Sequence, residues 1–191
     1  MKTSIGKSGF TLLAMGMLLC VVSFYAQAGG DEIPRAASTP NTPKNWQVPE
    51  YKIVAQAMVD ELIASHPEVV SITMHGTPPD AEEGIYTMFA SSFDDRAGNE
   101  SSPGDVITIK KGVTQIESKW GSANWKKKVS IVLPLKDSAG NYLPSAIIIA
   151  FKTSEGDPHM DTDFMAPGVV IRDGLNSRIP NFESLFAPVD Q

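Results

Sequence analysis

Residues 91–105 read SSFDDRAGNESSPGD. This segment is polar and is punctuated by Gly98, Pro103 and Gly104, so it is too irregular to form a helix or a strand. Strand-like sequence precedes it, and further strand-like runs follow it. Because loops held between sheet elements often carry binding groups, we expect this loop and the sheet behind it to form a small-molecule pocket.

Two strands are expected before this loop and three after it. The predicted strands cover residues 68–74, 85–91, 113–120, 125–135 and 146–151, where apolar residues alternate with others or form a continuous run. The run at 146–151 is typical of a central strand that is covered on both faces. Short turns between successive strands favour antiparallel pairing.

Helical patterns surround this group of strands. Helices are expected at residues 50–65, 105–111, 168–179 and 180–186. The first carries an apolar stripe that can pack on a sheet or pair with the same helix of a second copy as a homodimer. Asp105 is expected to cap the second helix, and Gly112 to close it. The sequence therefore predicts an α+β fold, with an antiparallel sheet of about five strands, an N-terminal amphipathic helix and C-terminal helices.

The N-terminus has the pattern of a secretory signal peptide. Lys2 and Lys7 precede an uncharged apolar run at residues 10–26, and Ala26-Gln27-Ala28 supplies the small residues of a cleavage site. We therefore expect cleavage before Gly29 and a periplasmic location. The alternative is an uncleaved membrane anchor, although the apolar run is short for a spanning helix.

Four regions follow from this pattern. They are a signal peptide at 1–28, a flexible leader at 29–47, a ligand-binding domain at 48–153, and an acidic loop with C-terminal helices at 154–191 that packs on the domain. Loss of the signal peptide changes the formal charge from −6 to −8, which argues against nucleic-acid binding. It also removes Cys20, the only cysteine, so no disulfide is expected.

Three places carry a resemblance to a known family. Residues 92–98 resemble the Ser…Arg-Ile-Gly segment of the PAS-like Cache domains of bacterial extracytoplasmic sensors, with Arg96 and Gly98 matching and Ala97 in place of the usual Ile or Leu. Asp105 matches the acid that opens the next short helix. Residues 134–140 resemble the hairpin between the last two strands, although Pro144-Ser145 stands where the family often has Gly. The similarity covers about residues 50–152.

The resemblance implies a sensor domain that binds a carboxylate, an amino acid or another small metabolite, with no cofactor. Such domains usually belong to histidine kinases, chemoreceptors or cyclases. This chain has no second apolar span after Phe151 and no kinase or cyclase region. We therefore expect a free-standing periplasmic form that is not an enzyme and acts through a membrane-bound sensor or transport partner.

Seven residues are candidate ligand contacts, because a guanidinium or ammonium group can hold a carboxylate, hydroxyls can orient a polar ligand, and aromatic rings can wall a pocket. They are Tyr86, Phe89, Ser91, Ser92, Arg96, Trp120 and Lys126. Other roles remain open. Arg96 could pair with Asp94, Asp95 or Glu100, the serines could cap local backbone, and the aromatic rings could belong to the core.

Three other functions remain as alternatives. The first is a protein-interaction module with a vestigial pocket, which would use the helix at 50–65 and the acidic C-terminal region. A metal or haem protein is the second, since Asp157, His159, Asp161 and Asp163 form a Asp-x-His-x-Asp-x-Asp pattern, but we interpret this run as a solvated loop and His75 as a surface or capping residue. The third is a carboxylate-based hydrolase, because paired carboxylates meet only in space.

Overall fold

The computed structural model describes residues 43–93, 95–117, 128–153 and 159–189, which all belong to one compact unit within residues 33–191. The helices are α1 (Val54–Ser65), α2 (Pro103–Lys111) and α3 (Met165–Asn176), with the 3₁₀ turns η2 (Asp161–Phe164) and η3 (Glu183–Phe186). The strands are β1 (Val69–Gly76), β2 (Thr87–Ser91), β3 (Gln115–Glu117), β4 (Lys128–Lys136) and β5 (Tyr142–Lys152).

The five strands form one antiparallel sheet in the order β2-β1-β5-β4-β3. This sheet and its helices confirm the predicted α+β class, with an antiparallel sheet of five strands in the described part of the chain. β5 lies in the middle, with β1 on one side and β4 on the other. Its continuous apolar sequence therefore occupies the position that this pattern predicts.

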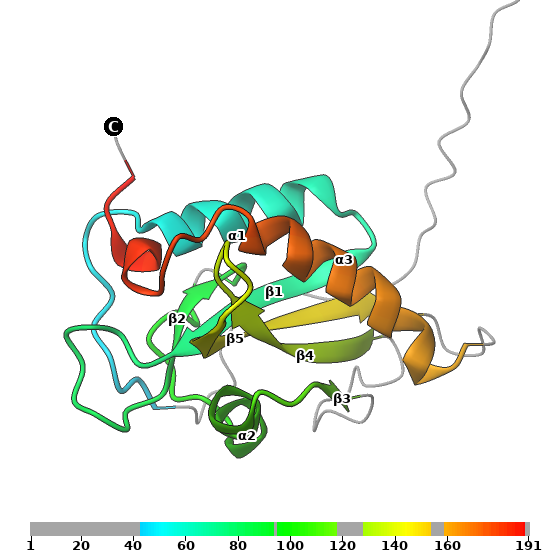
Figure 1. Ribbon diagram of the computed structural model, residues 1–191, viewed down its shortest axis with the longest axis horizontal. Coiled ribbons are helices and arrows are strands. Elements are labelled where there is room, and N and C mark those ends of the chain that lie inside the picture. Colours follow the sequence, from blue (N-terminus) through cyan, green and yellow to red (C-terminus); the bar gives the residue numbers. More distant parts are fainter. Residues whose placement is uncertain (1–42, 94, 118–127, 154–158, 190–191) are drawn as a thin grey trace, which may run out of the picture. The chain divides into compact units, whose positions relative to one another are not determined.

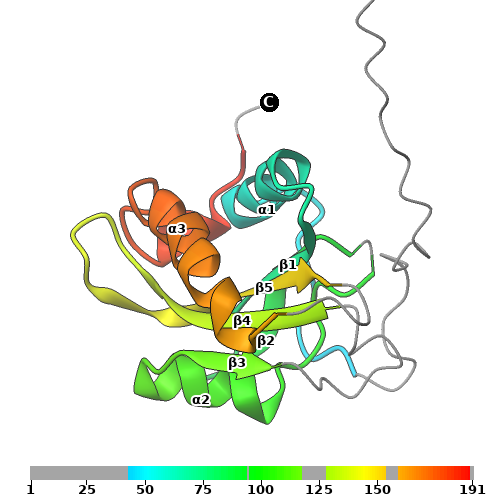
Figure 2. The same ribbon diagram turned by 90° about the vertical axis from the view of Figure 1, so that its right-hand side faces the viewer.

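The two faces of the sheet are covered differently. α1 and α3 lie on one face and α2 lies on the opposite face (Figures 1 and 2). The α1/α3 face holds the main apolar core, to which β4 and β5 contribute Val129, Ile131, Leu133, Ile147, Ile149 and Phe151. The α2 face has a much smaller apolar cluster, in which Val132, Ala146 and Ile148 pack under Ile109 of α2. Most of the fold's hydrophobic stabilisation thus comes from the α1/α3 face.

The structure moves the predicted helix starts, and α3 begins at Met165 instead of residue 168. α1 begins at Val54 instead of near residue 50, because Ile53 is extended and bridges Pro188, while Lys52 accepts a hydrogen bond from the Val189 amide. The N-cap of α2 is Ser102 instead of Asp105. Asp105 closes a capping box, since it accepts from the Ser102 amide while the Ser102 hydroxyl accepts from the Asp105 amide. Gly112 closes α2 in the left-handed conformation, as predicted.

Residues 43–46 pack against the loop that precedes α2. The amide of Asn45 donates to the Gly98 carbonyl at 2.9 Å, and the Lys44 ammonium donates to the Ala97 carbonyl at 2.7 Å. On the other side of the loop, the Gly98 amide donates to Met88 of β2 at 2.7 Å. Trp46 is buried, and its indole NH donates to Asp80. The loop is therefore held between β2 and the N-terminal segment.

Candidate functional site

Polar side chains line the α2 face of the sheet. Residues Ser71, Thr73, His75, Ser91, Lys128 and Ser130 are all buried, and strand alternation places them opposite the apolar face. A row of small residues crosses three strands, because Ala150 of β5 pairs with Ser71 on one side and Ser130 on the other. Glu117 of β3 is the next residue in that row. We call this row and the cations beside it the polar floor.

Charged groups of both signs meet at the polar floor. Burial, together with the positive charge of the nearby Arg96, lowers the pKa of Lys128 to about 8, and the negative charge of Glu117 only partly opposes this shift. Burial also raises the pKa of Glu117, together with the negative charge of Asp105, against the influence of Lys128. Shifted pKa values of this kind concentrate at functional sites. These residues come from a loop, α2, β3 and β4, so only the folded chain brings them together.

Glu117 lies against the first turn of α2. A Cβ added to Gly104 would stand 3.0 Å from a carboxylate oxygen of Glu117. Gln115, two residues earlier on the same face of β3, donates to the Gly104 carbonyl and to the Thr108 hydroxyl. The missing side chain at position 104 thus lets β3 approach the helix start, where the helix dipole favours a negative charge.

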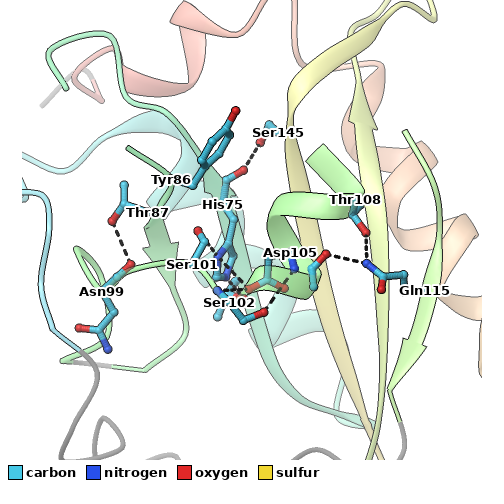
Figure 3. Close-up of polar contacts among 12 residues, drawn as sticks. His75, Tyr86, Thr87, Asn99, Ser101, Ser102, Asp105, Thr108, Gln115 and Ser145 are labelled. Atoms are coloured by element: carbon cyan, nitrogen blue, oxygen red, sulfur yellow. Dashed lines mark hydrogen bonds and ion pairs between the residues drawn. The ribbon is translucent and has the colours of Figure 1, made fainter. Parts of the chain in front are cut away.

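His75 is the centre of a buried hydrogen-bond network between β1 and α2 (Figure 3). Its Nδ1 lies 2.9 Å from the Ser101 hydroxyl and 3.5 Å from a carboxylate oxygen of Asp105, and its Nε2 lies 3.0 Å from the Thr73 hydroxyl. Burial lowers the pKa of His75, and Asp105 only partly opposes this. Burial therefore favours the neutral imidazole, and a proton on Nδ1 would match Asp105, because a carboxylate can only accept. Our interpretation of His75 as a surface or capping residue was wrong.

Acid is expected to destabilise the domain through His75. Its folded pKa is below that of the unfolded chain, so between these two values only the unfolded state takes up a proton. The free energy of unfolding should fall by up to about 1 kcal/mol from this group between pH 7 and pH 5.5. Urea denaturation at both pH values measures this loss. The loss should persist in the control His66→Gln and disappear in His75→Gln, and an equal loss in both variants would contradict the assignment.

The structure places the residues of the predicted loop in several environments. The Arg96 guanidinium stacks on Phe93, 3.9 Å from the ring centroid. Burial lowers the pKa of Arg96, and the negative charge of Asp95 opposes this shift. The Ser91 hydroxyl accepts from the Phe93 amide, and the Ser92 hydroxyl accepts from the Ile72 amide of β1. Both serine hydroxyls thus satisfy backbone groups, whereas Arg96 contributes charge to the polar floor.

Phe89 lies outside the polar floor. It is 1% exposed in the main core, where its ring centroid is 4.8 Å from that of Phe186 and 6.1 Å from that of Phe182. We had predicted it as a pocket wall, and this placement corrects that prediction. Tyr86 is half-buried just before β2, with the Lys110 ammonium 5.2 Å from its ring centroid. Trp120 and Lys126 lie outside the described residues.

Sequence reasoning missed several members of the polar floor. Ser71, Glu117, Lys128 and Ser130 were not among the candidate ligand contacts predicted from the sequence. The available signal was alternation in β4, where Lys128 and Ser130 face away from Val129 and Ile131. This alternation does not indicate that the polar face is buried, because its burial depends on the neighbouring strands and on α2.

The acidic segment supplies no metal site in the described part of the chain. Asp161 and Asp163 belong to η2, where the Asp163 carboxylate accepts from the Met160 amide. Asp157 lies outside the described residues. Within the described ranges, no three His, Cys, Asp or Glu side chains are placed to hold a metal ion. Over the same ranges, no helix has the length and apolar character that crossing a membrane requires.

Comparison with known proteins gives structural similarity without sequence similarity. No family model and no curated protein matches the chain. A type II free methionine-R-sulfoxide reductase from Thermoplasma acidophilum is 12% identical, with a TM-score of 0.41 over 66% of this chain and 93% of its own. The repressor BlcR from Agrobacterium tumefaciens is 10% identical, with a TM-score of 0.46 over 67% and 68% of the two chains.

The phycocyanobilin-bound GAF domain of a cyanobacterial phytochrome is also similar. It is 12% identical, with a TM-score of 0.37 over 65% of this chain and 82% of its own. No family is shown for this chain. The Cache resemblance stays an interpretation of the sequence.

Proposed function

We propose that this domain binds a small carboxylate or amino-acid-like metabolite at the polar floor. The observation that carries the proposal is that two cations, Arg96 and Lys128, lie close together at the polar floor. The same buried sheet face also carries serine and threonine hydroxyls. Binding sites for small molecules combine a protected surface with a few polar groups that fix orientation.

Electrostatics favour an anion at this place. Lys128 is only 7% exposed, and Arg96 is close enough to disfavour its charged form. A bound carboxylate would place an opposite charge beside both cations and would raise the pKa of Lys128 again. The guanidinium can hold two carboxylate oxygens at once, and the ammonium can add a third hydrogen bond. Glu117, which is cross-strand from Ser130 and close enough to influence Lys128, offers an acceptor to a ligand that also carries an amino group.

The biological role that we propose is sensing outside the cytoplasm. The signal-peptide pattern at residues 1–28 supports export to the periplasm. We propose no catalysis, and a ligand-loaded domain would act through a partner protein. The alternative is a protein-interaction module whose pocket is vestigial.

Charge removal at the polar floor should weaken binding without unfolding the domain. Thermal-shift screening of organic acids and amino acids on residues 29–191 would identify ligands, since a ligand at a hundredfold excess over Kd adds about 2.7 kcal/mol of stability. For those ligands, isothermal titration should show Kd rising about tenfold or more in Arg96→Ala and Lys128→Met, because each loses a charge-assisted hydrogen bond.

Lys111→Met is the matched control for this experiment. Lys111 is exposed at the end of α2, so the variant has the same charge change away from the polar floor. Its Kd should equal that of the wild type. An equal loss in Lys111→Met and Lys128→Met would point to general electrostatics and contradict the site. If no compound shifts the melting curve, the interaction-module alternative is favoured.

A further inference from the structure

The hydroxyl of Ser130 is an unsatisfied polar group in the interior of the domain. Ser130 is 1% exposed, and its Oγ is buried with no hydrogen-bond partner in the described part of the chain. Buried hydroxyls almost always have a partner, because leaving one unpaired destabilises the fold. An exception of this kind at a polar surface indicates a group that is satisfied by something other than the chain.

The position of Ser130 connects it to the proposed ligand site. Lys128 is two residues earlier on β4 and projects from the same face, about 7 Å away along the strand. The cross-strand neighbours of Ser130 are Ala150 and Glu117. Ala150 has no polar side-chain group, so the residue directly beside Ser130 on β5 cannot hydrogen-bond its hydroxyl. One small molecule can therefore contact the flexible Lys128 ammonium and the Ser130 hydroxyl together.

We propose that Ser130 is a specificity-determining residue, whose hydroxyl donates a hydrogen bond to an additional oxygen of the bound acid, outside the carboxylate that Arg96 and Lys128 hold. This inference rests on the proposed function and narrows its ligand class to acids that carry a hydroxyl, oxo or second carboxyl oxygen. In this arrangement Arg96 and Lys128 bind the carboxylate, and the Ser130 hydroxyl hydrogen-bonds the additional oxygen of the same ligand. A site built to hydrogen-bond a substrate oxygen rejects the analogue that lacks it, because its own polar group then stays unpaired.

Matched acids test the inference in the wild-type domain. The pairs are propionate with lactate, butyrate with 2-hydroxybutyrate, and butyrate with succinate, each titrated calorimetrically into residues 29–191. At least one oxygenated acid should bind about tenfold more tightly than its partner. In Ser130→Ala that preference should vanish, through a weaker affinity for the oxygenated acid and an unchanged affinity for the plain acid.

Stability without ligand gives a second readout. Ser145 is a fully buried serine whose hydroxyl donates to the His75 carbonyl at 2.8 Å, so it is the matched control. Ser145→Ala should lower the melting temperature, because it leaves a buried carbonyl with one fewer donor. Ser130→Ala should keep or raise the melting temperature, because it removes an unpaired group. A fall in Ser130→Ala as large as that in Ser145→Ala would overturn the inference.

The outcomes separate this inference from the function on which it rests. If none of these acids binds the wild type, a carboxylate site is excluded for them and the inference is overturned with it. If oxygenated and plain acids bind the wild type equally, the carboxylate site stands and only the role of Ser130 is overturned. A preference that survives in Ser130→Ala also overturns it.

Discussion

Gly98→Ala is expected to destabilise the domain by about 3 kcal/mol or more. Gly98 has φ +90°, a conformation that side chains rarely adopt, and an added Cβ would stand 2.5 Å from the Trp46 carbonyl oxygen. The backbone cannot easily move away. The Gly98 amide donates to Met88, and its carbonyl accepts from Asn45, so relief of the contact would break pairing on one side.

Gly140→Ala separates the effect of the contact from that of the dihedral angle. Gly140 has φ +87°, and a Cβ there would meet nothing within 4 Å. It should therefore cost only about 1 kcal/mol, which is the conformational term alone. Urea denaturation of both variants measures the difference. Equal losses of unfolding free energy in the two variants would mean that the contact with the Trp46 carbonyl adds no cost at position 98.

Gly98→Ala also tests whether the N-terminal segment at residues 43–46 positions the ligand site. Arg96 is two residues before Gly98, in the loop that is held between β2 and residues 43–46. A shift of this loop would move the guanidinium relative to Lys128. If Gly98→Ala folds at low temperature, its affinity for a carboxylate ligand should therefore also fall.

The sheet could be predicted because its pattern is local. Alternation in residues 129–135 and the continuous run at 146–151 each identify a strand from side-chain type alone. Short connections then favour antiparallel neighbours. The Gly112 stop of α2 was equally predictable, since a glycine after a helix is used for its left-handed conformation.

The start of α1 could not be predicted in this way. Pro49 and Glu50 are suitable first-turn residues, but Ile53 pairs with Pro188 from the far end of the chain. That pairing extends the backbone up to residue 53, and local propensity carries no information about it. Tertiary contacts override local preference at such places.

Only part of the candidate site could be predicted from the sequence, because tertiary contacts bring its other residues together. Arg96 stood out as a cation in a polar loop, and the structure brings it to the polar floor. Glu117 and Ser130 did not stand out, because an isolated acid or serine in a strand is usually solvated. They become significant only through the strand register, since the buried Ser130 pairs with the half-buried Glu117 on one side and with the buried Ala150 on the other.

Phe89→Ala is expected to destabilise the domain by about 4 kcal/mol. The side chain is among the largest that are fully buried, and it packs against Phe182 and Phe186 of the C-terminal segment. Its removal leaves a cavity under η3 that these rings can fill only in part. Chemical denaturation at pH 7 measures the loss. Tyr142→Ala is the control, since Tyr142 is 61% exposed and should cost well under 1 kcal/mol.

Phe89→Leu then distinguishes a core residue from a pocket wall. Leucine keeps most of the apolar volume, so the variant should remain folded with a moderate loss of stability. Phe89 belongs to the α1/α3 face of the sheet, whereas Arg96 and Lys128 belong to the polar floor on the other face. Carboxylate affinity measured on folded Phe89→Leu should therefore equal that of the wild type. A tenfold rise in Kd with little loss of stability would instead place Phe89 at the ligand, and would move the binding site to the apolar face.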